Sequence, residues 1–256
     1  MSNKVVLLII ILFISCNFSK EQDKAKEAPK KPTAISVVEN AIDAAGSLER
    51  WKNIASLSYT KKSRLLLENG EIESEVVQRH HYDFRPDKNI KISWRVGNDR
   101  FLIEHNDSIS QKFKNDSLVE EGSAVRSSVN SSLYVLGMPF KLLDKGTDLD
   151  YDGLKSINGI DTVHSINATY APNKYQNHST QDVWWYHFDK NNGAFLSSLV
   201  YHEPTYALIE NLEVVHTNGL TFPGIRKSYR CDENGEKIFL RAEFWYDDYS
   251  VEFVKN

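Results

Sequence analysis

The sequence predicts a mainly β (α+β) fold, in which an antiparallel sheet of about ten to eleven strands accompanies two or three short helices. Apolar and polar residues alternate over many short runs, such as residues 89–96 and 237–246, and this is the period of a strand with one buried face. Asn-Gly dipeptides separate these runs, and they favour the positive φ angles of tight hairpin turns. They stand at Asn69-Gly70, Asn158-Gly159, Asn192-Gly193, Asn218-Gly219 and Asn234-Gly235.

A first helix is predicted between Thr33 and Gly46. Threonine is a suitable N-cap because its hydroxyl accepts a bond from an early helix amide, and glycine commonly ends a helix. Ser47 is placed to cap a further short turn that presents Leu48 and Trp51. The predicted apolar face of the first helix consists of Ile35, Val38, Ala41, Ile42 and Ala45.

A second helix is predicted from Ser123 to Leu136. Val125, Val129 and Leu133 recur there at four-residue spacing, which places them on one face. The many serines of this segment have weak helix propensity, so we expect packing against the sheet to hold it.

The number of strands restricts the architecture. Short helices cannot cover one face of so wide a sheet, and open sheets rarely exceed about ten strands without curling. The sheet must therefore close, fold over or curl around a cavity. Residues 183–188 (VWWYHF) carry large apolar groups at successive positions, as expected of a strand with apolar surroundings on both faces.

The N-terminal residues predict a lipoprotein signal peptide over residues 1–15. Lys4 precedes an apolar run from Val5 to Ile14, which is shorter than the roughly 20 residues that a membrane-spanning helix needs. Phe13-Ile14-Ser15-Cys16 resembles the lipobox of bacterial lipoprotein precursors, with Phe13 in place of the usual leucine. This resemblance implies cleavage before Cys16 and lipidation of that cysteine, with palmitate among the attached chains.

Residues 16–32 are predicted to be the lipidated cysteine and a flexible tether, because the segment is highly charged and has no aliphatic residue larger than alanine. Residues 33–256 then form a single β domain of ordinary size. We expect a monomer in the cell envelope, anchored by its lipid to the outer membrane rather than the inner one. It would face the periplasm or the cell surface.

Three motifs in the right order resemble a family of Bacteroidetes lipoproteins. Residues 44–58 (AAGSLERWKNIASLS) match the opening of the family, in which a small-residue break and a tryptophan precede the first strand. Residues 136–146 (LGMPFKLLDKG) match its central segment, and residues 188–193 (FDKNNG) match a later strand and turn. Gly46-Ser47 stands where relatives often have two glycines.

That family is similar to Lol-type periplasmic lipoprotein carriers and outer-membrane lipoprotein-sorting proteins. The resemblance implies a curved antiparallel half-barrel, with helices on its concave side around an apolar cavity for acyl chains, and no catalytic residues. We expect the segment from Ser123 to Phe140 to cross the concave face as a lid. The predicted cavity residues are Trp94, Phe101, Val129, Leu133, Leu136, Met138, Phe140 and Trp185.

Other kinds of site find little support. Residues 148–153 (DLDYDG) match the start of a calcium loop, but Gly159 stands where the loop requires a bidentate acid. The sequence contains no nucleophile elbow, phosphate-binding loop or dinucleotide fingerprint. We therefore predict no metal, no cofactor and no catalysis. The net charge of −4, without a basic stripe, argues against a nucleic-acid partner.

Two functions follow as hypotheses. The first is a non-catalytic, membrane-anchored envelope lipoprotein whose cavity binds lipid or the acyl chains of lipoproteins. The alternative is a surface lipoprotein that binds or processes glycans. A deep and dry apolar cavity would favour acyl chains, whereas exposed aromatic side chains in a groove would favour sugar.

Overall fold

The structure is a computed structural model that describes residues 31–157, 160–171 and 182–255. Residues 32–256 form one compact unit, distinct from residues 1–31. The predicted signal peptide, Cys16 and nearly all of the predicted tether lie outside the described residues.

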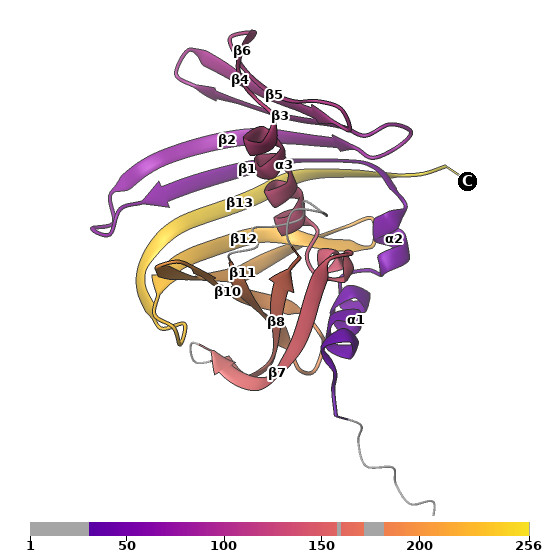
Figure 1. Ribbon diagram of the computed structural model, residues 1–256, viewed down its shortest axis with the longest axis vertical. Helices are drawn as coiled ribbons and strands as arrows, with labels where there is room; N and C mark the ends of the chain where they lie inside the picture. The colour runs from indigo at the N-terminus through magenta and orange to yellow at the C-terminus, as the bar shows by residue number, and fades with distance from the viewer. Residues whose placement is uncertain (1–30, 158–159, 172–181, 256) are drawn as a thin grey trace, which may run out of the picture. The chain divides into compact units, whose positions relative to one another are not determined.

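A single antiparallel sheet of 13 strands dominates the unit formed by residues 32–256, and it is curved and unclosed (Figure 1). Strand accounts for 61% of the described residues, far above the roughly 20–25% of ordinary globular domains, which confirms the mainly β class. The strand order is β6-β5-β4-β3-β2-β1-β13-β12-β11-β10-β9-β8-β7. The strands are β1 (Ile54–Leu66), β2 (Ile72–Asp83), β3 (Asn89–Val96), β4 (Asp99–Asn106), β5 (Ser110–Lys114), β6 (Ser117–Glu121), β7 (Thr147–Ile157), β8 (Ile160–Tyr170), β9 (Val183–Asp189), β10 (Phe195–His202), β11 (Thr205–Thr217), β12 (Leu220–Cys231) and β13 (Lys237–Phe253).

The predicted Asn-Gly turns account for many of the strand connections. Those at residues 69–70, 192–193, 218–219 and 234–235 join β1 to β2, β9 to β10, β11 to β12 and β12 to β13. The dipeptide at residues 158–159 lies outside the described residues. The sheet has more strands than the ten or eleven predicted. The short pair β5 and β6 is joined at Asn115 and Asp116, which adopt φ of 50° and 68° without a glycine to signal the turn.

The helices are α1 (Ala34–Ala44), α2 (Leu48–Lys52) and α3 (Ser123–Leu136), with the 3-10 helix η1 (Phe140–Leu143) after α3. The Thr33 hydroxyl caps α1 and the Ser47 hydroxyl caps α2, as predicted. The predicted face of α1 is wrong at Ile35, which is 48% exposed. The buried stripe is rotated slightly from the predicted face, because Ala34 and Val37, three residues apart, point toward the sheet in place of Ile35. It consists of Ala34, Val37, Val38, Ala41, Ile42 and Ala45.

The path of α3 follows from the strand order. β6 and β7 are consecutive in the chain but form the two opposite edges of the sheet. The connection between them must therefore traverse the sheet, and α3 followed by η1 makes that crossing (Figure 1). Weak helix propensity is compensated here by burial of Val125, Val129 and Leu136.

The sheet has apolar clusters on both faces. The main cluster joins α1, α3 and η1 to the face that we call inner, which carries Tyr82, Ile92, Ile166 and Phe188 among others. A second cluster consists of Leu199, Leu208 and Cys231, with Ile157, Trp185 and Tyr206 packed against it. Strand β9 contributes to both clusters, which confirms the two-sided apolar character predicted for residues 183–188. Among the described helices, none combines the length and the apolar composition that crossing a membrane requires.

Candidate functional site

An apolar cavity of about 460 Å³ lies where α1 and the end of α3 meet the strands β10 to β12. This volume falls within the roughly 300–1,000 Å³ typical of small-molecule sites. The lining is mainly apolar, and it consists of Ala41, Ala44, Ala45, Val135, Met138, Pro139, Asn192, Ala194, Phe195, Asn211, Val214, His216, Thr221, Phe222 and Pro223.

Two hairpin turns hold the α1 wall of the cavity through close backbone contacts. A Cβ atom on Gly46 would lie 2.1 Å from the carbonyl oxygen of Gly219, and one on Gly193 would lie 2.9 Å from the carbonyl oxygen of Asn40. The amide of Thr221 donates a hydrogen bond of 2.9 Å to the carbonyl of Ala45. The Asn-Gly turns thus position α1 as well as reversing the chain.

A chain of buried tyrosine hydroxyls holds α3 against the sheet. Tyr134 of α3 lies 2.5 Å, oxygen to oxygen, from Tyr170 of β8, which in turn lies 2.9 Å from Tyr186 of β9. Burial raises the pKa of Tyr170 to about 12, so the hydroxyl keeps its proton and can donate. The helix is therefore fixed by directed hydrogen bonds as well as by apolar packing.

The predicted cavity residues occupy different places. Met138 lines the apolar cavity, and Leu133 lines a separate, charged cavity. The side chains of Val129, Leu136 and Phe140 are at most 2% exposed and belong to the main cluster. The ligand contact expected of them from the sequence stays a prediction, and their burial favours a role in the core instead.

Of the three aromatic residues predicted opposite the lid, Trp94 packs against the main cluster, to which α3 also belongs, whereas Trp185 does not. Trp94 and Phe101 stack on each other, with centroids 5.1 Å apart, and border a groove of about 770 Å³ with Arg79, Arg95 and Arg100. Trp185 lies in the second cluster, on the face of the sheet opposite to the helices, whereas its neighbour Trp184 packs against the main cluster. In the sequence VWWYHF, odd and even positions both carry large apolar side chains, so alternation alone could not tell which tryptophan faces the helices.

The cavity also uses residues that the sequence reasoning missed. Three alanines near the end of α1 leave the space that larger side chains would fill, and Phe195 and Phe222 close it from the sheet. The small side chains of Ala41, Ala44 and Ala45 were the available signal, but a run of alanines in a helix is also ordinary helix composition.

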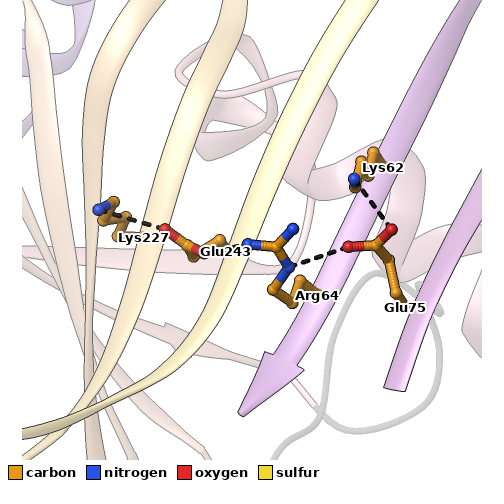
Figure 2. Close-up of polar contacts among 5 residues, drawn as sticks. All are labelled: Lys62, Arg64, Glu75, Lys227 and Glu243. Carbon is orange, nitrogen blue, oxygen red and sulfur yellow. Dashed lines mark hydrogen bonds and ion pairs between the residues drawn. The ribbon is translucent and has the colours of Figure 1, made fainter. Parts of the chain in front are cut away.

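The face of the sheet opposite the helices, which we call outer, carries a row of polar residues. Each residue of the row is paired in register with the next one on the adjacent strand, from β2 across the sheet to β8. The row is Glu75, Arg64, Glu243, Lys227, Glu210, Ser197, His187 and Ser165. Figure 2 shows its charged end, where Arg64 bridges Glu75 at 2.9 Å and Glu243 at 3.3 Å, and Lys227 reaches Glu243 at 3.2 Å. Partly exposed pairs of this kind contribute little stability individually, so their main effect is to match the strands in register.

The other end of this row is buried. The Ser197 hydroxyl lies 2.9 Å from His187 Nδ1, an arrangement that occurs in hydrolases. Ser197 and His187 are only 2% and 1% exposed, so a substrate has no access to the hydroxyl. Burial lowers the pKa of His187 to about 4, which keeps the ring neutral in the core. We therefore assign this pair a structural role.

Comparison with known proteins shows the fold. No family model and no curated protein sequence matches the chain. A DUF1329 family protein from Desulfovibrio piger is similar in structure, with a TM-score of 0.55 and 11% identity over 87% of this chain and 94% of the other.

Two further solved structures have related names. A LolA superfamily protein from Nitrosomonas europaea has a TM-score of 0.54 and 11% identity, over 88% of this chain and 96% of the other. A domain named as an outer membrane lipoprotein-sorting protein, from Vibrio parahaemolyticus, has a TM-score of 0.50 and 10% identity, over 84% of this chain and 93% of the other. The predicted Lol-type resemblance is thus confirmed in the fold, and residues 32–256 have a LolA-like half-barrel fold.

Proposed function

We propose that residues 33–256 bind an acyl chain of a lipid or lipoprotein in the apolar cavity beside α1, without catalysis. We further propose that the lipid on Cys16 holds this domain at the outer membrane of the cell envelope. The observation that carries the first proposal is the cavity of about 460 Å³, with its mainly apolar lining, in a fold shared with a LolA superfamily protein.

The chemistry of the lining suits a hydrocarbon chain. Each CH₂ group that leaves water for an apolar site gains about 0.8 kcal/mol, so a chain benefits along its whole length. The polar lining residues, among them Asn211 and His216, supply groups that can orient a ligand. The Asn211 side-chain amide already donates to the Phe195 carbonyl at 3.1 Å.

The test uses a soluble fragment, residues 17–256, which retains every described helix and strand. We expect native mass spectrometry to detect a co-purified lipid. We also expect the delipidated fragment to bind a fluorescent fatty acid saturably. A fragment that carries an oligosaccharide, or that binds neither lipid nor fatty acid, would refute acyl-chain binding.

A matched pair of variants on α1 locates the binding site. Ala44→Trp places a large side chain at the cavity from an exposed position of α1, and we expect it to abolish fatty-acid binding. Ile35→Trp adds a similar surface at a position of α1 that is 48% exposed and outside the lining, and it should leave binding unchanged. Equal binding by both variants would mean that the chain binds elsewhere.

A further inference from the structure

A second cavity, of about 490 Å³, lies on the other side of α3 from the apolar one. With 3.6 residues per turn, Arg126, Asn130 and Leu133 project from one side of α3 and line this cavity, whereas Val135 projects from the other side toward the apolar cavity. The cationic lining residues are Lys88, Arg126, Lys141 and Lys145. Among the described lining residues the acids are Asp107 and Asp144, so cations outnumber acids in this part of the lining.

Lys88 is the least compensated of these cations. Lys141 forms an ion pair with Asp144, but Lys88 makes no hydrogen bond and no ion pair with the part of the chain that the structure describes. Burial, with Lys141 and Arg126 nearby, lowers the pKa of Lys88, and Asp107 opposes this effect. A half-buried ammonium group without a close partner is stabilised when an anion enters beside it.

His105 adds a directional group at the same cavity. Its side chain is 4% exposed, and its Nε2 atom has no hydrogen-bond partner within residues 31–157, 160–171 and 182–255. Its Nδ1 lies 2.7 Å from the Ser110 hydroxyl, which accepts a bond of 3.5 Å from Arg126 Nε. Ser110 can then donate its own proton to Nδ1, and that tautomer leaves an Nε2–H donor unused. Unpaired buried donors are rare and usually mark a ligand or water site.

We propose that this cavity binds the phosphate group of an anionic lipid head group. Cationic side chains from the turn before β3, from α3 and from the segment after it converge on the cavity, and a neutral histidine donor accompanies them. The Lys88 ammonium group, which is unpaired among the described residues, and the His105 Nε2–H donor suit a phosphate, which has more acceptor oxygens than a carboxylate. The step from a phosphate to a phosphorylated lipid rests on the proposed acyl-chain function, whereas the phosphate site stands without it.

Calorimetry on fragment 17–256 tests the proposal with glycerol 3-phosphate, dihexanoyl phosphatidylglycerol, uncharged dihexanoyl glycerol and inorganic phosphate. Lys88→Gln removes the uncompensated charge. His105→Asn can keep the bond to Ser110 while it removes the Nε2 donor. Lys91→Gln is the control, because Lys91 lies on β3 and pairs with Glu104 outside the cavity. We expect the first two variants to weaken binding of glycerol 3-phosphate by about tenfold or more, and the control to leave it unchanged.

The outcomes separate the two proposals. Phosphate binding that survives in both cavity variants, or no saturable binding of any phosphate compound, would overturn the site. Inorganic phosphate that binds as tightly as glycerol 3-phosphate and dihexanoyl phosphatidylglycerol would overturn the head-group assignment. Glycerol 3-phosphate binding without fatty-acid binding would leave the phosphate site standing and refute the acyl-chain function. Melting curves of His105→Asn and Lys88→Gln confirm that each variant is folded before its affinity is compared.

Discussion

Trp51 of α2 and Phe140 of η1 stack face to face, with ring centroids 5.0 Å apart and ring planes 2° apart. These residues belong to two of the motifs that resemble the lipoprotein family, so the motifs meet in a single contact. Gly137 makes room for it, because a Cβ atom there would lie 2.8 Å from Cζ2 of Trp51. The stack fixes the end of the α3 crossing to the turn that follows α1.

A double-mutant cycle measures this contact. Phe140 is 2% exposed, so Phe140→Ala should lower the free energy of unfolding by about 3–5 kcal/mol. We expect a coupling between Phe140→Ala and Trp51→Ala of about 0.5–1.5 kcal/mol, the range for stacked aromatic pairs. Phe101→Ala serves as the control, since Phe101 stacks on Trp94 instead. Strict additivity of Trp51→Ala and Phe140→Ala in urea denaturation would contradict the stack.

Gly46→Ala should destabilise the protein well beyond the cost of a strained backbone. Gly46 has φ of +116°, and its substituted Cβ would lie 2.1 Å from the Gly219 carbonyl oxygen. Gly70→Ala is the matched control, because Gly70 has φ of +86° and nothing within 4 Å. The control should lose about 1–2 kcal/mol from strain alone. Equal losses of unfolding free energy in the two variants would show that α1 does not pack tightly on the β11–β12 turn.

Leu136→Ala and Met138→Ala should separate the core from the cavity within one segment. Leu136 is 1% exposed in the main cluster, so its truncation should cost about 2–5 kcal/mol and leave fatty-acid affinity unchanged. Met138 lines the cavity, so its truncation should cost less stability and alter that affinity. Thermal unfolding and fluorescent fatty-acid titration of both variants check this. The reverse pattern would place the ligand on the opposite side of the segment.

Acid should remove stability through His187. Burial lowers the pKa of His187 to about 4, below the ordinary 6.5, so the folded protein binds the proton less readily than the unfolded chain. The corresponding stability is complete above about pH 6.5 and is lost as pH falls toward 4, by up to about 3 kcal/mol. His187→Asn can retain the bond to Ser197 without titrating. Urea denaturation between pH 7 and 4 should therefore show a flatter pH dependence in the variant, and identical slopes would disprove this assignment.

The proposed membrane anchor has its own test. Cys16→Ser should block lipidation and leave uncut precursor, because the thiol that carries the lipid is missing. Metabolic labelling with palmitate and the mobility of the chain on a gel measure the two effects. A Cys16→Ser protein that is still cleaved and still labelled would show that residues 1–16 are not a lipoprotein signal.

The sequence by itself determined the local elements of the fold. Alternation, Asn-Gly turns and the Thr33 and Ser47 caps depend on interactions within a few residues, and they predicted the β class and the starts of the first two helices. The extra strands escaped prediction because Asn115 and Asp116 form their turn without a glycine.

Only the tertiary structure decided where these elements lie. A period of two shows which residues share a face but not which face meets the helices, so Trp184 and Trp185 could not be told apart. The crossing of α3 follows from β6 and β7 being opposite edges, and strand order depends on pairing between distant segments. Both cavities have the same origin. Each is lined by residues from distant segments, such as Ala44 with Phe222 and Lys88 with Lys141, which become neighbours only when the whole sheet has formed.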